Sequence, residues 1–346
     1  MHLTYLQAAI VGLIQGVTEM FPISSLGHNV LLPALVGGSW AKTLNVSGSK
    51  TPYLAFIVGL HVATALALMA YFWRDWIRII GGFFSSLRHR EIETPDQRLA
   101  WMIILATIPV GIVGVLFEHE FRVLFGTAIY AGIFLFANGL ILLAGEMFQR
   151  RSPKGRHAQR AQQADDAAIA TPSVRVSGAS LSGTPVAAAA TAGGGSAAVA
   201  MAAEHIDERD AGIASDRRLA RQSNGQAVLI GSAQILALLA GISRDGVVMV
   251  AGMFRGLSRE DAARFSFLLS APVILAAGAL KLPVLFGPQG KGILGPILVG
   301  SVLAAVGAYL SIKFLVSYLR TRTLTPFAIY CLIAGAFSIV YLGFIK

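Results

Sequence analysis

The sequence predicts an all-α polytopic membrane protein: six transmembrane helices and two re-entrant helical hairpins, about ten helices in an inverted-topology repeat. Three observations lead to this fold class. Of the 346 residues, 55% are hydrophobic and 13% are charged, and the mean hydropathy is +0.66, which is not the balance of a soluble domain. The apolar residues form runs long enough to cross a bilayer. Two further apolar segments are interrupted in a way that a lipid-facing helix would not tolerate.

The six expected spans are continuous apolar runs of about 20 residues, the length that a helix needs to cross the hydrocarbon core. They lie near residues 53–73, 99–117, 128–146, 265–281, 293–313 and 325–345.

The two expected hairpins cover residues 3–33 and 227–253, where Pro, Ser, Gly and charged residues break an apolar segment in the middle. Irregular backbone at membrane depth is stable only where protein or a water-filled cavity satisfies its polar groups. We therefore expect both segments to be re-entrant.

A polar segment divides the chain into two halves of the same plan. Residues 1–146 form the first predicted repeat and residues 226–346 the second. Residues 147–225 contain runs such as AAAATAGGGSAA and then mixed charges, a composition typical of a flexible, disordered linker. Each half has one hairpin and three spans, and an odd number of spans turns the second copy upside down.

The two hairpins share the pattern I-S-x-x-G at their breaks, in Ile23–Gly27 and in Ile242–Gly246. In inverted repeats, discontinuous helices meet near the midplane and form the site between them. We expect the two hairpin tips to meet in this way.

The formal net charge of +10 comes mostly from Lys and Arg in short segments beside the spans. Basic residues concentrate in residues 74–98, 147–160, 254–264 and 313–322. The positive-inside rule places these segments, and the linker, in the cytoplasm. This distribution explains the basic charge without a nucleic-acid partner.

The first hairpin tip carries ionisable groups that are costly at membrane depth and therefore indicate a site. Gln15 and Glu19 are four residues apart and share a helix face. A carboxylate there can hold a divalent cation, orient a water or take a proton. Ser24 and Ser25 add hydroxyls, and His28 adds a group that titrates near neutrality.

The second tip contains Ser243, Arg244 and Asp245 between glycines. A guanidinium among apolar helices needs an anion, and its fork geometry suits phosphate oxygens. An internal salt bridge with Asp245 or with Glu19 is the alternative, and the residues alone leave both open.

Other polar residues lie within the spans, including His61, Thr64 and Asn138. They could line the cavity between the tips. Hydrogen bonding between helices is the more common use of such residues.

Several segments resemble the bacterial undecaprenyl-diphosphate phosphatases associated with bacitracin resistance. QGVTEMFPISSLGH, residues 15–28, is similar to the first motif of that family. AGISRDGVVMVAGMFRGLSREDAARFSFLL, residues 240–269, resembles the second motif and the stretch beyond it, and LTPFAIY, residues 324–330, resembles the C-terminal span. The likeness covers most of the chain apart from the linker.

The resemblance implies hydrolysis of undecaprenyl diphosphate to the monophosphate and inorganic phosphate, which recycles the lipid carrier for peptidoglycan synthesis. It implies a bacterial inner-membrane enzyme with a divalent cation, Mg²⁺ or Ca²⁺, and a site that opens toward the outer face. A homodimer is left open. The residues that it assigns are catalytic Glu19, Ser25 and His28, phosphate-binding Ser24, Ser243 and Arg244, and candidate metal ligands Gln15, Glu19 and Asp245.

Three residues depart from the family's second motif: Ala240 replaces Pro, Asp245 replaces Ser, and Val248 stands where Thr is expected. Two other functions are compatible with the pattern, a polyprenyl-phosphate transporter or flippase of the same architecture and a non-catalytic homologue. If the protein is an enzyme, Ser25 attacks with His28 as base, or His28 or Glu19 activates a water.

Overall fold

A computed structural model describes residues 3–44, 52–170, 209–287 and 292–345. All regular structure within these ranges is helical. Six of the helices are long and apolar enough to cross a membrane, which confirms the predicted fold class. They are α4 (Pro52–Tyr71), α6 (Pro95–Phe125), α7 (Ala128–Arg151), α12 (Arg259–Phe286), α13 (Leu294–Thr321) and α14 (Thr325–Val340), which continues as a short π-helix, η2 (Tyr341–Ile345).

The first broken segment is a pair of helices, α1 (Tyr5–Met20) and α2 (Ser25–Val36), followed by the short α3 (Gly38–Thr43). Thr4 caps the start of α1 in a capping box with Gln7. The helix ends at Met20 because Phe21 is extended and Pro22 follows, a residue that disfavours helical backbone before it. Ser24 then caps the start of α2.

The second broken segment consists of α10 (Asn224–Ser232), a 3₁₀ helix η1 (Ala233–Leu238) and α11 (Arg244–Phe254). Gly241 has a φ of 115°, a value that residues with a Cβ rarely adopt. It lets the chain turn between η1 and α11. The Ser243 side chain then caps α11 by accepting from the Gly246 backbone N–H.

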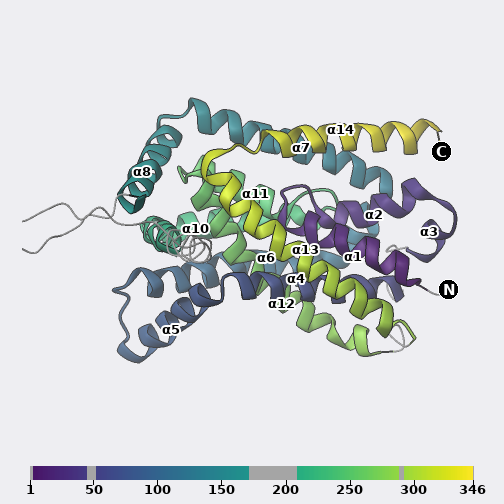
Figure 1. Ribbon diagram of the computed structural model, residues 1–346, viewed down its shortest axis with the longest axis horizontal. Helices are drawn as coiled ribbons and strands as arrows, with labels where there is room; N and C mark the ends of the chain where they lie inside the picture. Colours follow the sequence, from purple (N-terminus) through teal and green to yellow (C-terminus); the bar gives the residue numbers. More distant parts are fainter. Residues whose placement is uncertain (1–2, 45–51, 171–208, 288–291, 346) are drawn as a thin grey trace, which may run out of the picture.

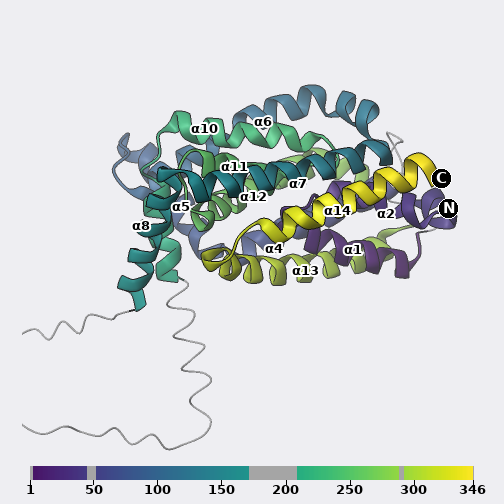
Figure 2. The ribbon, with the colours of Figure 1, turned by 90° about the horizontal axis from the view of Figure 1, so that it is seen from above.

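The two helical pairs enter the molecule from opposite ends. Figures 1 and 2 show both chain termini and α3 at one end, while α5, α8 and the start of α10 lie at the other. Helix α1 packs along α13, α14 packs along α7, and α11 packs against α7 and α12. The breaks in both helical pairs are therefore enclosed by the long helices.

Residues 74–98 were expected only as a basic cytoplasmic segment, but most of them are helical. Helix α5 (Trp73–His89) covers this part of the chain and packs against α6. Its sequence is amphipathic rather than uniformly apolar, so it does not stand out as a span.

The predicted linker, residues 147–225, is helical at both ends. Helix α7 runs to Arg151, α8 spans Pro153–Ala170, and residues 209–219 form another helix. The prediction of a disordered linker is wrong for these parts. Residues 171–208 lie outside the described residues.

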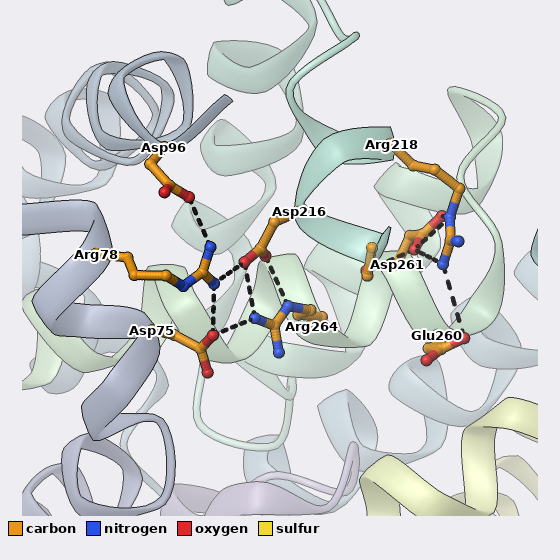
Figure 3. A network of polar contacts seen from close by, with 9 residues as sticks. Asp75, Arg78, Asp96, Asp216, Arg218, Glu260, Asp261 and Arg264 are labelled. Atoms are coloured by element: carbon orange, nitrogen blue, oxygen red, sulfur yellow. Dashed lines mark hydrogen bonds and ion pairs between the residues drawn. The ribbon is translucent and has the colours of Figure 1, made fainter. Parts of the chain in front are cut away.

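Ion pairs bind the helix over residues 209–219 to the rest of the molecule. Asp216 Oδ1 accepts from Arg264 Nε at 2.7 Å, and Arg218 Nη2 donates to Asp261 Oδ1 at 2.8 Å (Figure 3). Charged side chains in a low-complexity sequence do not reveal such partners, which come from α12, more than 40 residues further along the chain.

Candidate active site

The two hairpin tips are in direct contact. Ser24 Oγ accepts hydrogen bonds from the backbone N–H of Gly27 and from that of Gly241, both at 3.2 Å. A Cβ added to Gly27 would lie 2.8 Å from Gly241 Cα, so the two backbones approach too closely for a side chain. Ser24 itself has a φ of 70°, a strained value for a residue with a Cβ. The predicted meeting of the tips is therefore present, and Ser24 joins them.

Asn138 of α7 links the same two tips from the side. Its Nδ2 donates to the Pro22 carbonyl oxygen at 2.9 Å, and its Oδ1 accepts from the Ser243 N–H at 3.0 Å. The side chain is completely buried. One amide thus satisfies a backbone acceptor of the first tip and a backbone donor of the second.

Glu19 is the centre of the site. Its Oε1 accepts from Arg244 Nη2 at 2.6 Å. Its Oε2 accepts from Gln15 Nε2 at 2.9 Å and from the Ser25 hydroxyl. His61 Nε2 lies 3.4 Å from the same oxygen. The carboxylate therefore brings together a hydroxyl from the first tip and a guanidinium from the second.

Gln15 is fixed by a further amide. Its Oε1 accepts from Asn29 Nδ2 at 2.6 Å, so its Nε2 must face Glu19. Both Gln15 and Asn29 are buried. This chain of amides fixes the orientation of the Glu19 carboxylate without adding charge.

Arg244 keeps an unused donor. Its Nη2 is bound to Glu19, but its Nε is buried with no hydrogen-bond partner among the described residues. Asp245 Oδ1 lies 3.9 Å from this Nε, beyond hydrogen-bond distance. A buried donor without a partner costs about 1–3 kcal/mol. An anion at this position would remove that cost.

The polar contacts of His28 are with Ser24 and Tyr330 rather than with Glu19. Its Nδ1 is 2.7 Å from the Ser24 carbonyl oxygen, which can only accept, so Nδ1 carries the hydrogen. Its Nε2 is 2.7 Å from the Tyr330 hydroxyl of α14. The two rings are stacked, with centroids 5.7 Å apart. These contacts do not place His28 as the base for Ser25, because the Ser25 hydroxyl donates to Glu19 instead.

Asp245 faces α12. Its Oδ1 accepts from Ser266 Oγ at 2.9 Å and from the Ser270 hydroxyl. Asp245 thus replaces the Ser expected from the resemblance, and serines of α12 supply its hydroxyl partners.

The predicted cation ligands do not form a binding site together. Divalent cations of this type need several oxygen ligands. Gln15 presents its NH₂ group to Glu19, and the Glu19 oxygens already accept from hydrogen-bond donors, one of them the cation Arg244. Within the described ranges, no group of three His, Cys, Asp or Glu side chains is placed to hold a metal. The residues present therefore do not fit a cation held by the protein alone.

The structure brings most of the predicted residues together and adds several. The Glu19 cluster and the tip contact unite Gln15, Glu19, Ser24, Ser25, Ser243 and Arg244, whereas His28 and Asp245 turn to other helices. From the sequence alone, His61 and Asn138 have only a minor expected role, and neither Asn29 nor Tyr330 is expected in the site. Asn29 had one signal, its position directly after His28, and Tyr330 lies in the C-terminal segment that carries the family resemblance.

The fold and this cluster define a polytopic membrane protein with a buried polar site between two broken helical pairs, suited to an anionic group. A family model described as "Bacitracin resistance protein BacA" matches residues 8–194 and 174–337. The chain therefore belongs to this family.

Three relatives show how far the similarity extends. An undecaprenyl-diphosphatase of Mycolicibacterium paratuberculosis is 53% identical over 342 residues, which cover 99% of this chain and 98% of the relative. Undecaprenyl-diphosphatase 2 of Frankia alni is 53% identical over 347 residues, 98% of each chain. Undecaprenyl-diphosphatase 2 of Burkholderia orbicola is 37% identical over 330 residues, 95% of this chain and 94% of the relative.

Proposed function

We propose that this protein is a membrane phosphatase that hydrolyses undecaprenyl diphosphate to undecaprenyl phosphate and inorganic phosphate. This reaction recycles the lipid carrier for peptidoglycan synthesis and gives resistance to bacitracin. The family membership and the names of the relatives support it. The observation that carries it is one carboxylate, Glu19, in contact with both the Ser25 hydroxyl and the Arg244 guanidinium.

The proposed chemistry begins at Ser25. Glu19 accepts the Ser25 proton while Ser25 Oγ bonds to the terminal phosphorus of the diphosphate. The bond from that phosphorus to the bridging oxygen breaks, and the prenyl phosphate leaves with the bonding electron pair. Water then hydrolyses the phosphoserine, which releases inorganic phosphate and restores the hydroxyl. Direct attack by a water held on Glu19 is the alternative and needs the same base.

Arg244 is the proposed binding group for the transferring phosphoryl. The Arg244 side chain is 17% exposed, so part of it is accessible to a second anion beside Glu19, and its buried Nε donor has no partner among the described residues. Positive charge aimed at the phosphoryl oxygens stabilises the transition state. In this scheme Ser24 and Ser243 act indirectly, because their hydroxyls cap α2 and α11 and hold the tips in place.

His28 is the proposed second proton-transfer group. Its Nδ1–H is fixed on a backbone carbonyl, so transfer falls to Nε2, which the Tyr330 hydroxyl contacts. We propose that His28, when protonated on both nitrogens, donates its Nε2 proton to the Tyr330 oxygen while the Tyr330 hydroxyl gives its own proton to the oxygen that leaves with the prenyl phosphate. His28 then ends the step as the neutral imidazole and Tyr330 keeps its hydroxyl.

The expected divalent cation is proposed to arrive with the diphosphate, because the protein residues do not form a cation site. Calorimetry tests this directly. The free protein should show no saturable binding of Mg²⁺, while turnover should require the added cation. Saturable binding to the free protein that Glu19→Gln abolishes would overturn this part of the proposal.

The proposed location is the bacterial inner membrane, with the site open to the outer face and residues 147–225 in the cytoplasm. Helices α5 and α8 and the end of α7 lie at the end opposite the termini (Figure 1) and are rich in Arg, as the positive-inside rule requires of a cytoplasmic end. The expected homodimer is a separate proposal, which the mass of the purified protein in detergent tests.

The experiment that tests the function is phosphate release from undecaprenyl diphosphate by the purified protein. The parent should release phosphate, and Glu19→Ala, Arg244→Ala and His28→Ala should each reduce turnover, the first two most strongly. A parent that releases no phosphate, or variants that keep full turnover, would refute the assignment. If the protein were a polyprenyl-phosphate transporter, lipid transport would be the activity, and it would survive these substitutions.

A further inference from the structure

A cavity lies at the end of the molecule that carries α5, away from the Glu19 cluster. Its volume is about 710 Å³. It is lined by the end of α4, the first turns of α5, the helix over residues 209–219, the start of α12 and the last turns of α13. None of the residues proposed for phosphatase chemistry lines it.

The lining is strongly basic, with six cationic side chains and two carboxylates. The cations are Arg74, Arg78, Arg209, Arg264, Lys313 and Arg320, and the carboxylates are Asp75 and Glu260. This excess predicts an anionic ligand, provided that the cations are not already neutralised by carboxylates outside the lining.

Two of the arginines are neutralised in this way. Arg78 binds Asp75 at 2.7 Å, Asp96 at 2.7 Å and Asp216 at 2.6 Å. Arg264 binds Asp216 at 2.7 Å and Asp75 at 2.9 Å. Figure 3 shows the two guanidiniums sharing these carboxylates between α5, α12 and the helix over residues 209–219. This ion-pair network forms part of the cavity wall and holds the surrounding helices together.

Three other cations of the lining are exposed and have no ion pair with any described side chain. Arg209 and Lys313 have no polar partner among the described residues. Arg74 only stacks on the ring of Trp73, with its guanidinium carbon 5.1 Å from the ring centroid. The uncompensated charge of the cavity is therefore on its rim, where a ligand can reach it.

The same rim is apolar on the side of α5. Trp73 and Ile77 line the cavity and are both exposed. They begin a continuous exposed stripe along α5 that consists of Trp73, Ile77, Ile80, Phe84 and Leu87. The spacing of about one helical turn places all five on one face, while Trp76 and Ile79 are buried against the protein. A helix with such a face lies in the membrane interface, with its apolar side among the acyl chains.

Charge and hydrophobicity therefore meet at one place. With α5 in the interface, the rim cations would lie beside lipid headgroups and the apolar stripe would run from the cavity along the adjacent acyl chains. A soluble anion would use the cations alone, whereas a lipid with a negatively charged headgroup would use both surfaces.

We propose that this cavity binds an anionic phospholipid from the membrane leaflet in which α5 lies. The headgroup phosphate lies between Arg209 and Lys313, and an acyl chain lies along the exposed face of α5. The site is separate from the proposed phosphatase site and does not depend on its activity. Cations near an anionic lipid surface each strengthen binding by about fivefold. Loss of two of them should weaken the binding by roughly 25-fold.

Native mass spectrometry of the full-length protein in detergent tests this proposal. The parent is titrated with phosphatidylglycerol, phosphatidylcholine or inorganic phosphate, and compared with the double variant Arg209→Gln/Lys313→Gln. The matched control is Arg88→Gln/Arg255→Gln, which removes two exposed arginines, one from α5 and one from the end of α11, that do not line the cavity.

The expected result is tighter binding of phosphatidylglycerol than of phosphatidylcholine, weakened roughly 25-fold in Arg209→Gln/Lys313→Gln and unchanged in the control. Thermal unfolding in lipid-free detergent should match that of the parent, because neither residue has an ion partner among the described residues. Equal binding of the two lipids, or equal losses in the two double variants, would overturn the proposal. Binding of inorganic phosphate without phosphatidylglycerol would overturn the lipid assignment.

Discussion

Glu19→Gln replaces one carboxylate oxygen by an amide nitrogen and keeps the size of the side chain. In the structure, Oε1 accepts from Arg244, and Oε2 accepts from Ser25 and Gln15. Whichever oxygen becomes an NH₂ group therefore faces at least one donor. The variant also removes the base that contacts the Ser25 hydroxyl and leaves the Arg244 charge without its partner.

Loss of a positioned base reduces the rate by about 10²–10⁴-fold, which corresponds to about 3–5 kcal/mol of transition-state stabilisation. Breaking a buried ion pair also costs about 3–5 kcal/mol of folding stability. These two effects must be separated. Turnover is therefore measured as phosphate release per folded molecule, with the folded fraction taken from fluorescence-detected size exclusion.

Glu146→Gln is the matched control. Glu146 is buried like Glu19, and its Oε1 accepts from Arg259 Nη2 at 2.5 Å, but it lies near the C-terminal end of α7, beyond the position of Asn138 that contacts the hairpin tips. Both variants should lower the melting temperature, and only Glu19→Gln should reduce turnover per folded molecule. Equal turnover in the two variants would refute the role given to Glu19.

Three further predictions concern the supporting contacts. Tyr330→Phe removes the hydroxyl that contacts His28 Nε2 and should lower turnover by about 2–10-fold without changing the melting temperature. The control Tyr341→Phe should leave turnover unchanged, and equal rates in the two variants would contradict the proposed proton-transfer pair. Asn138→Leu leaves a buried donor and acceptor of the two tips unpaired and should cost about 2–6 kcal/mol of stability, read from thermal unfolding; a neutral effect would argue against the link. Burial alone would raise the pKa of the Asp75 carboxyl, but Arg264 and Arg78 beside it lower the pKa below the ordinary value of 3.8. The stabilising effect of the carboxylate is therefore present above pH 3.8 and is lost as the pH falls through the lower folded-state value. Asp75→Asn should be less stable than the parent at neutral pH and equally stable in acid, and parallel pH profiles of stability would contradict this.

The long spans could be predicted from the sequence because each is defined by composition over a single continuous segment. Helix α5 and α8 could not, since their residues are mixed in polarity and their stability comes from partners far along the chain. Arg218, for example, binds Asp165 on α8 and Asp261 on α12. Taken locally, the same charges favour a solvated linker.

The site was predictable as a set of residues, but not as a set of contacts. The sequence placed Glu19, Ser25 and Arg244 at two tips and left open whether Arg244 binds phosphate or Glu19. The structure shows the ion pair and, on the same guanidinium, an unpaired Nε. The direction of His28 depends on Tyr330, 302 residues away, and no local pattern encodes it.

The central claim is that the two hairpin tips form a single catalytic unit through Glu19 and Arg244. A double-mutant cycle on single-turnover phosphate release measures this directly, with Glu19→Gln, Arg244→Gln and the combined variant. Because the two side chains are in contact at 2.6 Å, the combined loss should be smaller than the product of the single losses, with a coupling energy of about 0.5–3 kcal/mol. Losses that multiply within error would contradict the claim.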